Sequence, residues 1–235
     1  MTQTLSRQEA SDAVTNLGWR YMLGMVRTSV PVDSLAQAAD LSVRLVEAAG
    51  ESADGSVWMD VRRDRLVLTL QSLAAANMTA HEVELARRIS AAVEELGLRL
   101  DPGVGGPDNS DGEPRAVQAI EIAIDALDIA RIRPFWKAVL GYHDESGATG
   151  PKDPLIDPIG QGPAIWFQQM LEPRPQRNRI HFDVAVPHDE ATHRMEAALA
   201  AGGVLLSATR APAFWVLADA EGNEACITTW QGRDK

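Results

Sequence analysis

The sequence predicts an α+β protein of two domains, and three observations support this fold class. Residues 101–114 read DPGVGGPDNSDGEP, a turn-rich segment without apolar periodicity that predicts a linker. Before it, helix and strand patterns follow the order α-β-β-α-β-β-α, and after it one pattern occurs twice. We therefore expect an N-terminal domain at 1–100 and a C-terminal domain at 115–235. A long surface loop within one domain is the less favoured alternative.

Composition narrows the functional classes. The chain has 235 residues, of which 45% are hydrophobic, so it can bury a core. Its net charge of -11 repels phosphate backbones and disfavours nucleic-acid binding. No apolar run approaches the ~20 residues of a membrane span, and MTQTLSRQEA lacks the layout of a signal peptide. Cys226 is the single cysteine, which excludes an internal disulfide and fits a cytoplasmic location.

The first half of the N-terminal domain begins with a capping box. Ser6 and Glu9 have the spacing that starts a helix. The stretch WRYMLGMVRTSV at 19–30, with Gly24 near its middle, predicts a hairpin or two short strands. Asp33 is the expected N-cap of a second helix, which includes Val43 and Val46 among its apolar positions and ends near Gly50.

The second half repeats this order of elements. Residues 57–72 predict two strands around a tight turn near Arg63 and Asp64. Thr79 and Glu82 form another capping box, and the helix that follows ends at Gly97.

The residues from about 5 to 98 resemble the pterin-4a-carbinolamine dehydratase family. The resemblance depends on ESADGSVWMDVRRDRLVLTLQS followed by MTAHEVELARRI. The family places two adjacent histidines before its third strand and another at the end of its fourth, where they bind the pterin and move the proton. The corresponding positions here, together with the two acidic positions that survive, form a degenerate site at Glu51, Gly55, Ser56, Ser72 and Glu82.

This degenerate site lacks the group that the reaction needs. Dehydration of a carbinolamine requires a side chain that gives and takes protons near neutral pH, and Gly and Ser cannot do so. His81 is close in sequence but belongs to the first turn of the predicted helix. We therefore expect a dehydratase-shaped domain without catalysis, which leaves a surviving ligand site or an oligomerisation role.

The C-terminal domain is an internal repeat. Residues 116–170 and 178–230 each begin with a strand, VQAIEIAID or NRIHFDVAV. A helix follows, LDIARIRPFWKAVLGY or DEATHRMEAALAAGG, and a last strand, GPAIWFQQM or GNEACITTW. Two short strands fit between the helix and the last strand, so the repeat predicts a paired βαβββ unit.

Strand alternation makes four positions of the repeat equivalent in pairs. Glu121 aligns with His181 at the start of the first strands, and Ala164 aligns with Glu224 in the last strands. Alternation also puts Asp183 on the face of His181, and Cys226 on the face of Glu224.

Residues 116–232 resemble the vicinal-oxygen-chelate superfamily, which includes glyoxalase I, extradiol dioxygenases and fosfomycin- and bleomycin-resistance proteins. The matching stretches are LDIARIRPFWKAVLGY, with its LG turn, and VLADAEGNEACI, similar to the closing signature of the family. In the metal-using members the ligands come from the four equivalent positions. The resemblance therefore implies that Glu121, His181 and Glu224 hold a divalent metal, while Ala164 cannot bind one.

One imidazole and two carboxylates suit Fe, Mn, Ni, Co or Zn. Three protein ligands leave positions for water and a chelating substrate, and Glu121 or Glu224 is the expected general base. Isomerisation of the glyoxalase type, extradiol cleavage and thiol addition to an epoxide all fit the scaffold. The alternative is a metal-free binding or sequestering protein, in which His181 is structural, Asn223 caps a turn and Glu224 pairs with an arginine.

Aromatic residues indicate where a small-molecule partner would bind. Trp166 and Gln168 share one face of their strand, and Trp136 and Trp215 flank the same unit. These four are the predicted ligand-binding residues, with burial in the core as the alternative for the tryptophans. Paired units in one chain could close a site alone, or two chains could exchange halves in a homo-oligomer.

Overall fold

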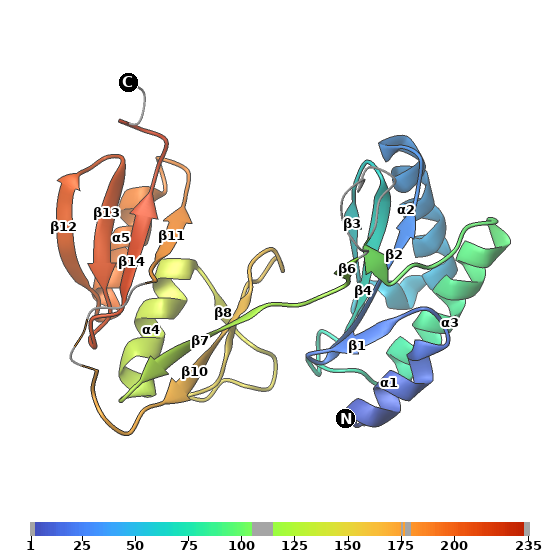
Figure 1. Ribbon diagram of the computed structural model, residues 1–235, viewed down its shortest axis with the longest axis horizontal. Coiled ribbons are helices and arrows are strands. Elements are labelled where there is room, and N and C mark those ends of the chain that lie inside the picture. The colour runs from blue at the N-terminus through green and yellow to red at the C-terminus, as the bar shows by residue number, and fades with distance from the viewer. Residues whose placement is uncertain (1–2, 105–114, 175, 177–179, 233–235) are drawn as a thin grey trace. The chain divides into compact units, whose positions relative to one another are not determined.

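The computed structural model describes residues 3–104, 115–174, 176 and 180–232 (Figure 1). Its contacts divide the chain into two compact units, Met1–Ala119 and Ile120–Lys235. The division falls later than the predicted boundary between 114 and 115. The reason is that Gly103–Val104 (β5) pairs with Arg115–Ala116 (β6), so both ends of the predicted linker belong to the first unit. Residues 105–114 of that linker lie outside the described residues.

The N-terminal unit has the predicted order of helices and strands. Its sheet has the strand order β1-β2-β4-β3, with every neighbouring pair antiparallel. The bounds are α1 Arg7–Thr15, β1 Arg20–Met22, β2 Met25–Pro31, α2 Leu35–Ala49, the 3-10 helix η1 Glu51–Ala53, β3 Val57–Val61, β4 Arg65–Leu70 and α3 Ala80–Glu95.

Local sequence explains most of these boundaries. Both capping boxes are present, at Ser6 with Glu9 and at Thr79 with Glu82. The hairpin β1-β2 turns at Leu23 and Gly24, which both have positive φ as a tight two-residue turn requires. The N-cap of α2 is Ser34, whose Oγ accepts from the Gln37 amide at 3.1 Å, and not Asp33 as predicted.

The helices and the sheet of this unit pack together around one apolar core, which includes Trp19, Leu45, Leu68 and Ile89. The helix α2 buries Leu41 and Leu45, whereas Val43 and Val46, two of the apolar positions on which the predicted helix was based, are exposed. The apolar stripe of α2 therefore runs along a different face from the one that spacing predicted.

The C-terminal unit consists of two βαβββ repeats, as predicted. Its two sheets have the strand orders β7-β10-β9-β8 and β11-β14-β13-β12. The first repeat comprises β7 Glu121–Ala126, α4 Ile129–Leu140, β8 His143–Asp144, β9 Leu155–Ile156 and β10 Ala164–Gln169. The second comprises β11 Phe182–Ala185, α5 Ala191–Ala200, β12 Val204–Arg210, β13 Phe214–Ala218 and β14 Glu224–Thr228.

A shared core joins the two repeats. The helices α4 and α5 contact each other, and Phe135, Trp136, Leu217 and Ile227 belong to one cluster of buried residues. Gly141 ends α4 in the left-handed conformation, with φ of 70°, which gives the LG turn of the sequence a physical reason. The α+β fold class of both domains is thus confirmed. Within the described residues, no helix is long and apolar enough to cross a membrane.

Candidate functional site

Parallel pairing places the predicted ligand positions at corresponding ends of two strand pairs. In the first repeat β10 runs parallel to β7, with Ala164 opposite Glu121. In the second, β14 runs parallel to β11, with Phe182 opposite Ala225. His181 comes directly before Phe182, and Glu224 comes directly before Ala225. The register of β11 with β14 therefore agrees with the equivalent positions that the repeat predicted.

The predicted ligands occupy the sheet faces that lie away from the helices. In β7, Glu121 is exposed, whereas Ile124 is buried in the core with α4. In β11, His181 and Asp183 are exposed, and Phe182 packs against Trp136 of α4 with ring centroids 5.4 Å apart. We call these two surfaces the open faces of the C-terminal unit.

Donor atoms converge around one of the predicted ligands, His181. Its Nε2 lies 3.5 Å from Oδ1 of Asp183. With Sγ of Cys226 these ligand atoms all lie within 4.8 Å of one another, the one such group of three found among the described residues. Glu121 and Glu224 are outside this group, so the convergence of Glu121, His181 and Glu224 on one metal stays a prediction.

Glu121 instead lies near another carboxylate, Glu145, just after β8. Burial raises the pKa of Glu145, and the negative charges of Glu121 and Asp153 raise it further. Glu145 therefore keeps its proton to a higher pH than an ordinary glutamate and is a candidate acid or base near Glu121. No sequence signal pointed to it, because it belongs to the turn-rich segment 143–161.

The turn DAEGNE before β14 is organised by a buried aspartate. Asp219 is 2% exposed, and its carboxylate accepts from Nε1 of Trp136 at 2.9 Å. It also accepts from the backbone amides of Glu221 and Asn223, both at 2.9 Å, and from Nδ2 of Asn223 at 2.7 Å. These four donors hold the turn against α4 and set the start of β14 at Glu224.

The neighbouring Glu221 connects the second repeat to the first. Its carboxylate accepts from the amides of Leu127 at 2.8 Å and Asp128 at 2.6 Å. Asp128 is the N-cap of α4, so a side chain of the β13-β14 turn satisfies donors at the start of that helix.

The first repeat has a matching turn before β10. Asp157 accepts from the amides of Ile159, Gln161 and Gly162. The left-handed glycine is Gly160, with φ of 67°, and it corresponds to Gly222, with φ of 87°. Gly222 comes two residues before Glu224, whereas Gly160 comes four residues before Ala164, so the turn of the first repeat carries two further residues.

A cavity of about 810 Å³ opens beside β7 and β11. Apolar lining comes from Ile122, Ile124 and Phe182, and the turn contributes Asn223 and Glu224. An ion pair of 3.0 Å between Arg174 and Asp125 lies on its wall. The size and the mixed lining suit a small-molecule ligand.

The predicted ligand-binding residues divide between cavity, core and open face. Trp136 lines the cavity but is 1% exposed and bonded to Asp219, so it serves mainly as core. Trp166 and Gln168 are exposed on the open face of β10, and Trp215 packs partly buried against the core. These last three are not among the described residues that line the cavity.

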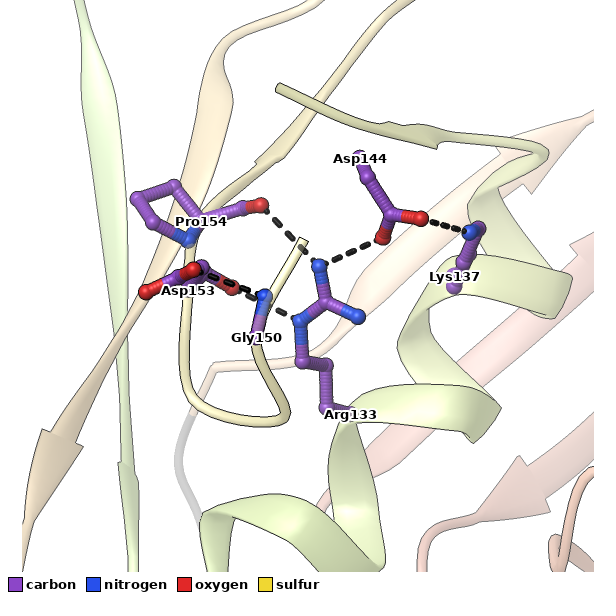
Figure 2. A network of polar contacts seen from close by, with 6 residues as sticks. All are labelled: Arg133, Lys137, Asp144, Gly150, Asp153 and Pro154. Carbon is purple, nitrogen blue, oxygen red and sulfur yellow. Dashed lines mark hydrogen bonds and ion pairs between the residues drawn. The ribbon is translucent and has the colours of Figure 1, made fainter. Parts of the chain in front are cut away.

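A polar network holds the loop between β8 and β9 against α4 (Figure 2). The buried guanidinium of Arg133 donates to Oδ1 of Asp144 at 2.6 Å and to the carbonyl of Asp153 at 2.7 Å. Nζ of Lys137 donates to the second oxygen of Asp144 at 2.6 Å. The bonds from Lys137 and Arg133 hold the pKa of Asp144 below its usual value.

In the N-terminal unit, most positions of the degenerate site come together. The Leu73 amide donates to the carbonyl of Gly55 at 2.9 Å, which brings Ser72 beside Gly55 and Ser56. Oγ of Ser56 donates to Oε1 of the buried Glu82 at 2.6 Å. Glu51 lies apart, exposed on η1.

The carboxylate of Glu82 is occupied by structural bonds. Its Oε2 accepts from the amide of Thr79 at 2.8 Å and from the hydroxyl of Thr79 at 2.5 Å. With Ser56 on the other oxygen, this carboxylate closes the capping box of α3 and joins it to the strand region.

We expect no carbinolamine dehydration above background from the whole chain. The groups at Gly55, Ser56 and Ser72 do not titrate near neutral pH, so none can move the proton. A coupled assay of dehydration, with an active dehydratase as positive control, measures this. A rate above background that disappears in a His81→Ala variant would contradict the expectation.

Comparison with known proteins finds a family model that matches part of the chain. Residues 121–228 match the family model described as a glyoxalase-like domain. The match covers just under half of the chain and nearly all of the second unit. The C-terminal unit is therefore similar to glyoxalase-like domains. No curated protein matches the chain significantly.

Solved structures that are similar to this chain each cover less than half of it. A glyoxalase/bleomycin resistance protein/dioxygenase family enzyme from Burkholderia phytofirmans PsJN is 18% identical, with a TM-score of 0.38, covering 46% of this chain and 95% of that chain. A fosfomycin resistance protein from Listeria monocytogenes, complexed with Mn(II) and dihydroxypropylphosphonic acid, is 13% identical, with a TM-score of 0.37. The match covers 48% of this chain and 90% of that chain. A transcriptional coactivator/pterin dehydratase from Brucella melitensis is 19% identical, with a TM-score of 0.35, covering 38% and 98%.

Proposed function

We propose that the C-terminal unit is a small-molecule enzyme of the glyoxalase and dioxygenase kind that uses a divalent metal bound at His181. The observation that carries the proposal is the parallel register of β11 and β14. That register sets His181 and Glu224 at the same end of neighbouring strands. The cavity of about 810 Å³ is lined by Glu224 and by Ile180 and Phe182, the sequence neighbours of His181, but not by His181 itself.

The donor types present fit a divalent metal. His181 offers an imidazole nitrogen, and the equivalent positions Glu121 and Glu224 offer carboxylate oxygens, a set that suits Fe, Mn, Ni, Co or Zn. When bound, such a metal would polarise an oxygen pair of the substrate. Glu121 or Glu224 would take the role of general base, and Glu145, with its raised pKa, would hold a proton beside Glu121.

Metal analysis of protein purified without chelator tests this function. We expect about one metal per chain in the natural protein and a loss of at least about tenfold in metal affinity for His181→Ala. Glu196→Ala, on the exposed side of α5 in the same unit, is the matched control and should keep the metal. Absence of bound metal after incubation with Fe, Mn, Ni, Co and Zn in turn would contradict the proposal.

A metal-free binding or sequestering protein is the second candidate, and the cavity itself favours it. Its apolar walls and the Arg174–Asp125 pair could hold a hydrophobic ligand with a polar group without any metal. A thermal-shift screen in the presence of chelator separates the two candidates. Protection by aromatic compounds that is unchanged by added metal would support the binding protein.

Oligomeric state bears on the role of Glu121. Because Glu121 is outside the His181 group of its own chain, we propose that a second copy supplies this carboxylate if Glu121 is a ligand. Light scattering of the chain with metal and with chelator measures the mass directly. A monomer that loses metal on Glu121→Gln would contradict this.

A further inference from the structure

We infer that Cys226 and Asp183 bind the metal together with His181, which makes the site a thiolate site suited to Zn²⁺ or Co²⁺. This inference rests on the proposed function, because it names the ligands and the class of metal at the same end of β11 and β14. It differs in chemistry from the set of Glu121, His181 and Glu224, which has no sulfur ligand.

Strand register brings the three side chains together. Asp183 and Cys226 are direct partners in the parallel pair of β11 and β14. His181 comes two residues before Asp183, and the period of two places both on the same face. The ligand atoms lie within 4.8 Å of one another, and Nε2 of His181 is 3.5 Å from Oδ1 of Asp183. Ligand atoms around a tetrahedral zinc ion are roughly 3.5 Å apart, given the usual bond lengths of about 2.0–2.3 Å.

Burial differs among the three ligands in a way that leaves one side of the site open. Cys226 is 7% exposed, so its sulfur lies at the floor of the open face. The side chains of His181 and Asp183 are 47% and 64% exposed and stand above it. A metal bound by all three would therefore keep a fourth position toward solvent or substrate, as a catalytic zinc site does.

Charge and softness of the ligands select the metal. The Cys226 thiol gives its proton to solvent as the sulfur–metal bond forms, so one proton is released for each metal bound. Thiolate and imidazole ligands favour Zn²⁺ and Co²⁺, whereas a set of one nitrogen and carboxylate oxygens is better matched to Mn²⁺ or Fe²⁺. The carboxylate of Asp183 adds a negative charge that offsets part of the charge of the ion.

Titration of the full chain with Co²⁺, kept reduced by a reductant that contains no thiol, tests the inference directly. Because Cys226 is the single cysteine, any thiolate-to-cobalt charge-transfer band in the near ultraviolet must come from it. We expect this band to saturate at one Co²⁺ per chain and to disappear when Zn²⁺ is added. The apparent affinity should fall as pH falls, because protons compete for the thiolate.

Variants separate this site from the alternative ligand set. Cys226→Ser should abolish the band, and Asp183→Asn should weaken Co²⁺ binding by at least about tenfold. Asp189→Asn, a matched exposed aspartate of the same repeat, should bind like the natural chain. Because Asp183 is exposed, its variant is expected to fold even if Cys226→Ser, at a buried position, does not.

Two results would overturn the inference. One is Co²⁺ binding without a charge-transfer band, lost on Glu121→Gln or Glu224→Gln and kept in Asp183→Asn; the proposed metal-dependent function would then stand with other ligands. The other is no metal binding at all, which would overturn the proposed function as well.

Discussion

Replacing Asp219 with alanine is expected to lower the free energy of unfolding of the C-terminal unit by about 3–5 kcal/mol. The substitution removes the acceptor of four hydrogen bonds inside a buried turn. The Trp136 indole and the Asn223 side chain both donate to Oδ2 of Asp219, and both would lose this acceptor. Because the turn leads into β14, the position of Glu224 should change with it.

Urea unfolding followed by tryptophan fluorescence measures this loss, with the two units expected to give separate transitions. Asp219→Asn should be milder, since its remaining oxygen can still accept from the two backbone amides. Asp189→Ala, at an exposed position, is the control and should stay within about 0.5 kcal/mol of the natural chain. A loss below about 1 kcal/mol for Asp219→Ala would show that water replaces the carboxylate.

Replacing Arg133 with methionine is expected to destabilise the same unit by about 3–5 kcal/mol. Methionine fills much of the space of the arginine stem but cannot donate to Asp144 or to the carbonyl of Asp153. The guanidinium is buried. In the variant, its former partners, the Asp144 carboxylate and the Asp153 carbonyl, are therefore only partly accessible to water. The loop between β8 and β9 should loosen, and Glu145 lies in it.

The Arg133 variant also has a predicted pH dependence. Lys137 and Arg133 lower the pKa of Asp144 in the folded protein, so their contribution to stability is present above the unfolded pKa of this carboxyl. It is lost as pH falls through the lower, folded pKa. Arg133→Met should therefore lose less stability than the natural chain on going from neutral to acid pH.

A Lys137→Met variant is the matched control for this network. It removes the larger of the two causes that lower the pKa of Asp144. It should nevertheless destabilise the unit less than Arg133→Met does at neutral pH, because Lys137 is more exposed than Arg133. Equal losses for the two variants would contradict the role that we assign to burial of Arg133.

Much of the fold could be predicted because its causes are local. The capping boxes at Ser6 and Thr79 are short patterns that satisfy helix amides wherever they occur. The C-terminal repeat was visible because both halves carry the same order of apolar runs. The face of α2 was less predictable, since Val43 and Val46 have helical spacing but the sheet packs against Leu41 and Leu45 instead.

The site was predictable only in part, for a reason that lies in strand register. The proximity of His181 and Asp183 follows from a period of two within one strand. That Cys226 lies opposite Asp183 depends on how β14 pairs with β11, which the sequence of neither strand specifies. Glu145 had no periodic pattern to reveal it, because the segment around it forms turns.

The cap that Glu221 provides has a consequence for how the C-terminal unit folds. The carboxylate contacts amides that are 94 and 93 positions away along the chain, so it reaches them only after both repeats have been built. Contacts between residues so far apart in the sequence form slowly. The start of α4 should therefore be among the last parts to gain protection from hydrogen exchange. While a ribosome has released only the first repeat, the two amides that directly precede α4 therefore lack this acceptor.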